Sequence, residues 1–425
     1  MKKLPKKLIA LRLAKKVRQL LDSKTLTVIA VTGSIGKTSA KVAIGQLLSS
    51  AHQVQFSEDS YNTDIGLPLS FFGLKAPTNL WDPVAWHRIL QKINSIIKNY
   101  PYDIIVLEMA DDELEDMMKL LAFIKPSYGV ITGVARVHMD RMGSIEKVIH
   151  DNCMIASQAK TVIYNGEFES LAKQASKIKN SVGYGTQRDS IRFGNIVRLK
   201  SGNLQATLYF GKQSHKITTK MVGVQSLSSL LAAASVASQL GMEIKDIAKG
   251  LAKIEGVNGR MRLIKGVNGS SIIDDSYNSS PVAAIAALGV LGDINAKKRI
   301  AILGNMNELG EYARKGHYEV GKVAAAKADM LIVIGRDAEI NIVEGAKAGG
   351  MDSDNIKMFK TPYEVGHFLK RILAKGDVVL VKGSQNGVFL EEAVRILLDP
   401  SLNPKDFVVR QSKSWQRKKR KAFGL

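Results

Sequence analysis

One short segment near the N-terminus restricts the fold more than any other part of the chain. An apolar run at residues 26–31 leads into Thr32-Gly33-Ser34-Ile35-Gly36-Lys37-Thr38-Ser39, and helical character follows as far as position 48. Strand, glycine-rich loop and helix in this order are typical of phosphate-binding loops, because glycines allow backbone N–H groups to face a phosphate at the positive end of a helix. The strict Walker A pattern has a glycine where this chain has Val31, so the segment is a shorter variant of that loop.

The side chains of this loop suit a nucleoside triphosphate. Lys37 can neutralise the outer phosphates, and the hydroxyl of Thr38 can coordinate magnesium. The plainer interpretation is a glycine turn between strand and helix, with Lys37 in solvent. Because glycine, lysine and threonine coincide at one strand-to-helix junction, the sequence favours phosphate binding.

Two further residues are candidate magnesium ligands. Glu108 directly follows an apolar strand predicted at residues 104–107, and His138 lies in the segment that follows another strand at residues 130–131. The carboxyl ends of parallel strands meet at one edge of a sheet, so we expect both side chains near the phosphate loop. Taken alone, each residue would be interpreted as an ordinary surface or capping residue. A metal site is favoured because both residues follow strands of the same sheet at its carboxyl edge.

Short apolar runs alternate with helical stretches along most of the chain. Alternation of this kind predicts mostly parallel sheets that are covered on both faces. Residues 192–220 alternate in polarity and predict an antiparallel excursion, and the alanine-rich residues 227–240 predict a packed helix. The other predicted strands lie at residues 26–31, 104–107, 130–131 and 162–164, and later at residues 271–273, 299–303, 330–334 and 377–381.

A glycine-rich stretch divides the chain. Gly256, Gly259, Gly266 and Gly269 mark the best candidate for a hinge or domain boundary. We therefore predict an α/β protein, with a central P-loop ATPase-type parallel-sheet domain followed by a Rossmann-like C-terminal domain. The predicted parts are a basic N-terminal helix at residues 1–25, the ATP-binding domain at 26–258, the C-terminal domain at 259–400 and a basic tail at 401–425.

The positive charge of the chain is concentrated at its two ends. The 425 residues include 61 Lys and Arg against 39 Asp and Glu, a net charge of +22 that would ordinarily suggest a nucleic-acid-binding protein. Residues 1–24 hold nine basic residues and one acid, and residues 401–425 hold eight basic residues and one acid. Because most of the excess charge lies in these two ends and not in the body of the chain, we expect no specific nucleic-acid partner.

The single cysteine, Cys153, excludes a disulfide framework and fits a reducing cytoplasm. No stretch reaches the ~18 apolar residues of a membrane-spanning helix.

An ordered set of further motifs resembles one enzyme family. Besides the phosphate loop, the motifs are Tyr61-Asn62-Thr63-Asp64-Ile65-Gly66-Leu67-Pro68-Leu69, Val106-Leu107-Glu108-Met109, His138-Met139-Asp140, Gly259-Arg260, Ile273-Asp274-Asp275-Ser276-Tyr277-Asn278-Ser279-Ser280-Pro281, Leu303-Gly304-Asn305-Met306-Asn307-Glu308-Leu309-Gly310-Glu311 and Val381-Lys382-Gly383-Ser384. With these motifs the chain resembles the ATP-dependent Mur ligases. Within that family it is most similar to the branch that adds D-alanyl-D-alanine to a UDP-N-acetylmuramoyl tripeptide.

The resemblance implies a role for each matching position. Lys37, Glu108 and His138 are the implied catalytic residues, and Thr38, Glu108 and His138 are the implied ligands of magnesium ions. The implied ATP-binding residues are Gly33, Ser34, Ile35, Gly36, Lys37, Thr38, Ser39, Arg260, Asp275, Tyr277 and Asn278. The implied substrate-binding residues are Asn62, Thr63, Asn305, Glu308, Lys382 and Ser384, and the alternative for the last four is ordinary loop and cap positions of an α/β domain.

The resemblance also implies the reaction. ATP would phosphorylate a small-molecule carboxylate, an amine would attack the acyl phosphate, and phosphate would leave, with Mg²⁺ as the metal cofactor. Every step moves negative charge, which calls for lysine and magnesium more than for a covalent nucleophile. The expected product is a muramoyl-peptide precursor of the cell wall. The alternatives are a ligase for another anionic or lipid-linked carboxylate and a noncatalytic ATP-binding homologue.

Four departures from the family pattern bear on this function. About 25 residues precede the phosphate strand, where the family has a domain of roughly a hundred residues that grips UDP. The lysine that is commonly carbamylated falls at Asn152 and the acid two positions on at Met154, although the adjacent Asp151 can compensate. An apparent insertion at residues 75–100 has one apolar helical face, which either packs on the body or forms a lid or interface. The residues usual near adenine are replaced by Gln225, Ser226 and Ser229.

The two basic ends have more than one interpretation. A helix near the N-terminus would carry an apolar stripe that includes Leu8, Leu13 and Val17, and this stripe either lies on an anionic membrane or docks on the body. The C-terminal run at residues 415–421 would bind lipid headgroups, RNA or nothing specific, and we expect it to be disordered. We expect a cytoplasmic monomer, with peripheral contact to the inner face of the membrane through the basic ends as an open alternative.

Overall fold

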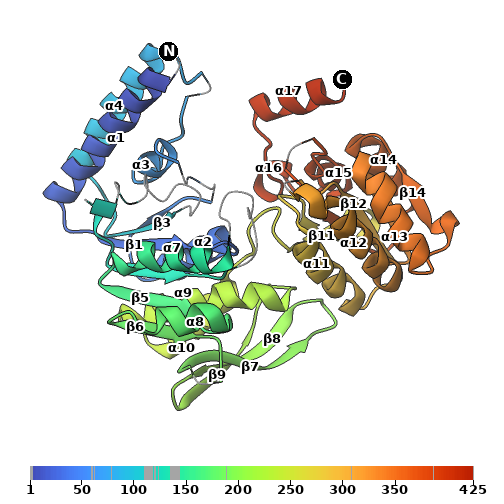
Figure 1. Ribbon diagram of the computed structural model, residues 1–425, viewed down its shortest axis with the longest axis horizontal. Coiled ribbons are helices and arrows are strands. Elements are labelled where there is room, and N and C mark those ends of the chain that lie inside the picture. The colour runs from blue at the N-terminus through green and yellow to red at the C-terminus, as the bar shows by residue number, and fades with distance from the viewer. Residues whose placement is uncertain are drawn as a thin grey trace. The chain divides into compact units, whose positions relative to one another are not determined.

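The computed structural model divides the chain into two compact units. It describes residues 3–424 except 59, 60, 62, 78, 110–117, 119, 120, 123, 135–143, 188, 308 and 386, and it does not describe the side chains of residues 3–5. The first unit comprises Met1–Ile196, Gln205–Thr219 and Gln225–Ile254. The second comprises Val197–Leu204, Lys220–Val224 and Glu255–Leu425. Each unit has its own sheet and its own hydrophobic core (Figure 1).

The first unit is built on a six-stranded sheet in which neighbouring strands pair in parallel. In spatial order the strands are β2 (Val54–Phe56), β3 (Ile104–Glu108), β1 (Thr27–Thr32), β4 (Tyr128–Ile131), β5 (Thr161–Asn165) and β6 (Ser181–Tyr184). All but the first residue of β1 are buried, which requires cover on both faces of the sheet. The predicted parallel α/β architecture is therefore confirmed.

Helices supply this cover. On one face, the alternate residues Val28 and Ala30 of β1 share a core with α1, α3 and α4. On the other side, α2 contacts β2 and β3 and packs against the alanine-rich α9, which confirms the helix predicted at residues 227–240. The helices of this unit are α1 (Lys3–Ser23), α2 (Lys37–Leu48), α3 (Gly66–Ser70), α4 (Pro83–Lys98), α7 (Ile145–Ser157), α8 (Glu169–Ala175), α9 (Leu227–Gln239) and α10 (Ile244–Lys253).

The antiparallel excursion predicted at residues 192–220 is also present. It consists of β7 (Ile191–Arg198), β8 (Leu204–Phe210) and β9 (Gln213–Thr218), and β8 pairs with β9 in antiparallel register. Gly202 and Gly211 occupy the two turns with φ angles of +87° and +56°, a backbone region that favours glycine.

The second unit has a Rossmann-like sheet of six strands. Their spatial order is β10 (Arg262–Lys265), β11 (Ser271–Asp275), β15 (Val378–Lys382), β12 (Arg299–Gly304), β13 (Met330–Ile334) and β14 (Ile356–Met358), and only β10 is antiparallel to its neighbour. Before the C-terminal tail, the described α-helices of this unit are α11 (Pro281–Asp293), α12 (Ala313–Lys327), α13 (Val343–Ala348), α14 (Pro362–Ile372) and α15 (Glu391–Leu397). The glycine-rich stretch predicted as a hinge contains β10, which pairs with β11, so only its start coincides with the change of unit at Glu255.

The C-terminal tail is helical over much of its length, so the expectation that residues 415–421 are disordered is wrong. It forms α16 (Pro404–Phe407) and α17 (Lys413–Ala422). Lys419 of α17 is fully buried, and its ammonium lies 3.1 Å from a Glu391 carboxylate oxygen and 2.7 Å from one of Glu392. Two buried carboxylates need buried cations, so these ion pairs fix the tail to α15. Within the part of the chain that the structure describes, no helix combines the length and apolar character needed to cross a membrane.

Candidate functional site

The phosphate loop joins β1 to α2 through two glycines with positive φ. Gly33 has φ +134° and Gly36, the N-cap of α2, has φ +81°. A Cβ atom on Gly33 would lie 2.4 Å from the Thr132 hydroxyl and 2.9 Å from the Gly133 carbonyl oxygen. Both the backbone conformation and this close approach therefore require glycine at position 33.

The polar groups of the loop are engaged with the neighbouring strand end. The N–H groups of Ser34 and Ile35 donate to the carbonyl oxygen of Gly133, at 2.8 and 3.4 Å. The Lys37 ammonium donates to the carbonyl oxygen of Gly33. Among the described residues, no side chain caps the N-terminus of α2, which leaves its positive end for an anion.

Three buried side chains meet beside this loop. The Thr38 hydroxyl donates to a carboxylate oxygen of Glu108 at 3.0 Å, and the Lys41 ammonium donates to the same oxygen at 3.0 Å. The exposed fractions of these side chains are 4% for Thr38 and Glu108 and 2% for Lys41. Glu108 is brought to the loop because β1 and β3 pair in parallel with Val31 opposite Glu108. Hydroxyl and carboxylate oxygens are ligands that magnesium prefers, so Thr38 and Glu108 fit that ion.

Lys41 was not predicted from the sequence. It lies one helical turn after Lys37, within the largely apolar and buried face of α2. A lysine at such a position needs a buried acid, and Glu108 was already a candidate residue. The helical spacing and the charge together were thus the signal that could have revealed the pair.

Asn152 lies beneath the start of the phosphate loop. Its amide oxygen accepts from the Thr32 hydroxyl at 2.7 Å, and its amide nitrogen donates to the Val148 carbonyl oxygen at 2.8 Å. Both Asn152 and the adjacent Asp151 are buried. In this arrangement the Asn152 amide oxygen acts as a hydrogen-bond acceptor that holds Thr32.

Some predicted site residues lie elsewhere or outside the described residues. His138 and Asn62 fall outside them. The Thr63 hydroxyl accepts from the N–H of Gly66, the first residue of α3, at 3.0 Å. Of the residues predicted near adenine, Gln225 is exposed, while Ser229 donates to the Ser226 carbonyl oxygen at 2.6 Å.

A second cluster lies at the carboxyl ends of β11 and β15 in the second unit. Asp275 and Lys382 are register partners, and the Lys382 ammonium lies 2.6 Å from an Asp275 carboxylate oxygen. The same ammonium donates to the Asn278 carbonyl oxygen at 2.9 Å. The neighbouring Asp274 is fully buried, and burial raises the pKa of its carboxyl to about 6. Of the predicted residues, the structure therefore brings Asp275, Asn278 and Lys382 together.

Tyr277 lies beside this cluster between two arginines of the same unit. The guanidinium carbons of Arg260 and Arg410 are 4.4 and 4.6 Å from the centre of its ring. Arg410 also donates to the Tyr277 carbonyl oxygen at 3.1 Å. Arg410 was not predicted, because it lies in the basic tail at residues 401–425, for which the sequence indicated no site residue.

Asn305 and Ser384 are adjacent, and both stabilise loops. The Ser384 N–H donates to the Asn305 carbonyl oxygen at 2.9 Å, and the Ser384 hydroxyl accepts from the Asn307 N–H at 2.8 Å. The Asn305 amide oxygen accepts from the Ala338 N–H at 2.9 Å. These bonds match the loop-and-cap alternative for the two residues. Glu308 lies outside the described residues.

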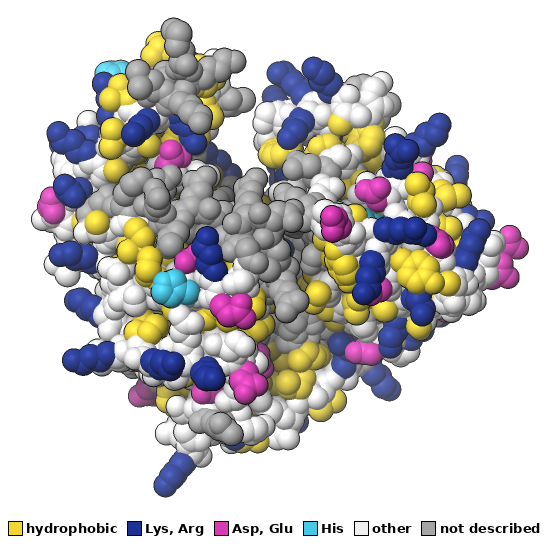
Figure 2. Space-filling model, viewed as in Figure 1, with side chains coloured by type: hydrophobic (Ala, Val, Ile, Leu, Met, Phe, Trp, Pro, Cys, Tyr) yellow, Lys and Arg dark blue, Asp and Glu magenta, His cyan; other side chains and the backbone are white. Residues whose placement is uncertain are grey.

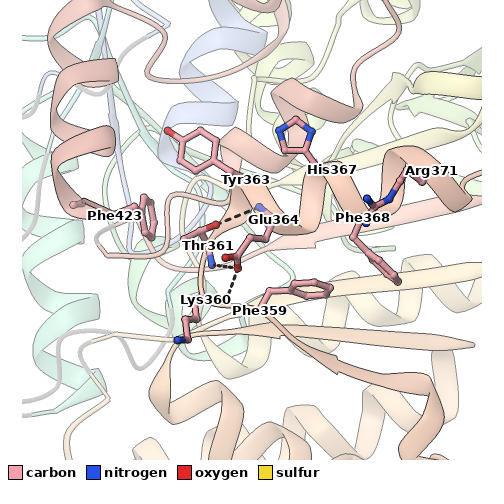
Figure 3. A pocket seen from close by; sticks show the side chains of 10 residues that line it. Phe359, Lys360, Thr361, Tyr363, Glu364, His367, Phe368, Arg371 and Phe423 are labelled. Atoms are coloured by element: carbon pink, nitrogen blue, oxygen red, sulfur yellow. Dashed lines mark hydrogen bonds between the residues drawn. The ribbon is translucent and has the colours of Figure 1, made fainter. Parts of the chain in front are cut away.

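The second unit also has a hollow apart from these clusters (Figure 3). Its volume is about 840 Å³, and it lies between α14 and the end of α17. Glu364 accepts hydrogen bonds from the backbone N–H groups of Lys360 and Thr361, which forms the capping box of α14. None of the predicted site residues lines the hollow. Its lining comprises Phe359, Lys360, Thr361, Tyr363, Glu364, His367, Phe368, Arg371, Ala422 and Phe423.

Two family models match the chain along most of its length. The Mur ligase middle domain matches residues 31–237, and the Mur ligase glutamate ligase domain matches residues 259–385. The chain belongs to the Mur ligase family. It is accordingly a ligase of the Mur type, and the phosphate loop and the β11–β15 edge each lie within one of the matched ranges.

Curated relatives and solved structures agree with this assignment. The UDP-N-acetylmuramoyl-tripeptide--D-alanyl-D-alanine ligase of Bacillus subtilis is 28% identical over 383 residues, which are 88% of this chain and 77% of that protein. The enzyme of the same name from Escherichia coli is 25% identical and covers 91% of this chain and 79% of its own. The MurF ligase of Thermotoga maritima in complex with ADP aligns with a TM-score of 0.74 and 25% identity, over 91% of this chain and 83% of that one.

Proposed function

We propose that this Mur ligase uses ATP to activate a carboxylate as an acyl phosphate, and that it adds D-alanyl-D-alanine to a muramoyl tripeptide of the cell wall. The observation that carries the proposal is the buried cluster of Thr38, Lys41 and Glu108 at the end of the phosphate loop. The names of the relatives support the choice of substrates, and the ADP in the Thermotoga maritima MurF structure supports the choice of nucleotide.

The residues of the first unit provide the charge that phosphoryl transfer needs. Lys37 neutralises the outer phosphates, and the N-terminus of α2 faces them. Thr38 and Glu108 hold magnesium, together with His138, and the ion supplies charge stabilisation at the transferred phosphoryl group. The positive charge of Lys41 balances the negative charge of the buried Glu108 carboxylate, because a buried carboxylate without a cation would be strongly unfavourable.

The residues of the second unit contribute the remaining contacts. We assign residues 26–258 to the ATP-binding domain and residues 259–400 to the C-terminal domain. Arg260, Asp275, Tyr277 and Asn278 contact the nucleotide. The residues that bind the substrates are Asn305, Glu308, Lys382 and Ser384 in the second unit and Asn62 and Thr63 in the first.

A noncatalytic ATP-binding homologue is the second candidate function. Two observations favour it: the Ser34 and Ile35 N–H groups already donate to Gly133, and the Asn152 amide oxygen already accepts from Thr32. Phosphate binding by these N–H groups would require the loop to give up the Gly133 contacts. A ligase for another anionic carboxylate differs from the main proposal only in its substrate.

Phosphate release separates the three functions. Purified protein is incubated with ATP, magnesium, muramoyl tripeptide and D-alanyl-D-alanine, and each component is omitted in turn. The main proposal predicts release that requires both the carboxylate and the amine. Phosphate release that occurs only when another carboxylate replaces the muramoyl tripeptide would favour a ligase for that carboxylate. ATP binding without release for any carboxylate would favour the noncatalytic homologue and overturn the proposal.

A further inference from the structure

Two helices that are far apart in the sequence begin at the same end of the first unit. The α1 helix ends at Ser23 just before β1, and α4 ends at Lys98 shortly before β3. Because β1 and β3 are parallel neighbours with Thr27 opposite Ile104, the two helices end at one edge of the sheet. Their first turns therefore lie together at the far end, as Figure 1 shows beside the mark for the N-terminus.

Large apolar side chains are exposed at this end of both helices. With a rise of 1.5 Å per residue, Leu8 lies about 22 Å from the end of α1 and Val84 lies about 21 Å from the end of α4. The two side chains are thus at the same level. The exposed fractions are 51% for Leu8, 61% for Leu11, 42% for Leu80, 52% for Trp81 and 56% for Val84. We call these five residues the apolar tip.

Hydrogen bonds hold the part of the apolar tip that lies at the start of α4. The indole N–H of the buried Trp86 donates to the Leu80 carbonyl oxygen at 2.9 Å, which fixes the turn that carries Trp81. Asp82 caps α4 by accepting from the Val84 and Ala85 N–H groups. The opposite faces of the two helices are buried in one core through Leu13, Val17, Leu20, Trp86 and Ile93. The apolar stripe of the N-terminal helix was expected either to dock on the body or to lie on a membrane. Its buried residues dock on the body, whereas Leu8 and Leu11 are exposed to solvent.

Positive charge surrounds the apolar tip. The α1 and α4 sequences contain ten Lys and Arg residues and one acid, Asp22, which lies at the opposite end of α1. Lys7, Arg12, Lys15 and Arg88 are exposed near the tip. Figure 2 shows hydrophobic and basic side chains gathered over this end of the molecule. The positive charge disfavours association with a second copy of the same surface. It favours a partner that has negative charge at its surface and an apolar layer below that surface.

We propose that the apolar tip docks on the surface of an anionic lipid bilayer. Leu8, Leu11 and Trp81 enter the interface, where tryptophan is favoured, and the surrounding basic side chains meet the lipid phosphates. This surface is distinct from the phosphate loop and from the reaction proposed above. It gives the ligase a place at the surface of a membrane.

Vesicle binding tests the proposal with the full-length chain. The protein should sediment with vesicles of 30% phosphatidylglycerol in phosphatidylcholine, and it should stay in the supernatant with vesicles of pure phosphatidylcholine. Trp81→Ser with Leu11→Ser should lower the partition coefficient at least tenfold. Lys7→Gln with Arg12→Gln should lower it by roughly 25-fold, since each basic residue near such a surface contributes about fivefold. Binding should weaken at high salt.

Matched controls decide which part of the chain is responsible. Val282→Ser removes an apolar side chain that is 79% exposed in the second unit, and it should leave binding unchanged. Neutralising Arg417, Lys418 and Lys421 of α17 tests the other basic end. The tryptophan emission of the wild type should shift to the blue on vesicles, and Trp81→Phe should abolish the shift. Absence of vesicle binding, binding lost only with the α17 changes, or self-association through the tip would each overturn the proposal.

Discussion

Replacing Lys41 by methionine is the sharpest test of the buried cluster beside the phosphate loop. Methionine keeps most of the apolar stem of the side chain but removes the ammonium group that lies 3.0 Å from Glu108. Both partners are at least 96% buried, so water cannot replace the lost charge. Removing one partner of a buried ion pair typically costs about 3–5 kcal/mol, because the remaining charge is left uncompensated.

Urea unfolding measures this cost. In a Trp415→Phe background, the remaining Trp81 and Trp86 both report on the first unit, so its transition can be followed separately. With an m value of about 2 kcal/mol/M, Lys41→Met should lower the midpoint by roughly 1.5–2.5 M. Adding Glu108→Gln should recover most of the loss, because the second change removes the unpaired charge.

Two results would refute this reasoning. A Lys41→Met protein within 1 kcal/mol of the wild type would mean that the pair contributes little to stability. A double variant no more stable than Lys41→Met alone would mean that the lost stability comes from packing and not from the stranded carboxylate. Lys16→Met, at a half-exposed position of α1, is the matched control and should change the midpoint little.

Three further changes probe the rest of the structure. Lys37→Ala should reduce ATP turnover at least ~100-fold with an unchanged unfolding midpoint, because it removes phosphate neutralisation and no core packing; wild-type turnover would refute the assigned role. Gly33→Ala should weaken ATP binding and destabilise the first unit by about 1–3 kcal/mol, since a side chain is strained at φ +134°; calorimetric titration and unfolding check both, and a neutral effect would contradict the geometry. Lys419→Met should destabilise the second unit by about 1–3 kcal/mol and expose the tail to proteases, because Glu391 and Glu392 lose their shared buried cation and keep only Arg410 and Arg395; a tail that stays protected would show that other contacts hold it.

The sheets could be predicted from the sequence because their central strands are buried on both faces. Strands β1, β3, β12, β13 and β15 each contain four consecutive Val, Ile, Leu or Ala residues, which is typical of strands in a parallel sheet covered on both faces. The edge strands β2, β6, β10 and β14 were missed. They are only three or four residues long and include polar residues, so their pairing depends on neighbours that are distant in the sequence.

The site was predictable where local patterns fix the chemistry. The glycine loop and Glu108 follow from strand ends and turn residues, and the structure brings Thr38 and Glu108 within hydrogen-bonding distance. Lys41 and Arg410 were missed for a different reason. Each contacts an acid or a ring 67 or more positions away in the chain. The position of Lys41 on the buried face of α2 was the available signal, whereas no local pattern marks Arg410.

The tail illustrates the same limit. Residues 415–421 contain five basic residues and no acid, and the expectation that they are disordered followed from this composition alone. The structure instead buries Lys419 against Glu391 and Glu392, two acids that lie 28 and 27 positions earlier. Charge that looks excessive within a segment can therefore be balanced by another part of the fold.

The identity of the reaction product tests the account most directly. Mass spectrometry of a reaction with ATP, magnesium, muramoyl tripeptide and D-alanyl-D-alanine should reveal the tripeptide extended by one dipeptide, with one ADP and one phosphate formed for each product molecule. The Lys37→Ala protein should form none above background. ATP hydrolysis with an unmodified tripeptide, or an extended product in equal yield from Lys37→Ala, would contradict the central claim.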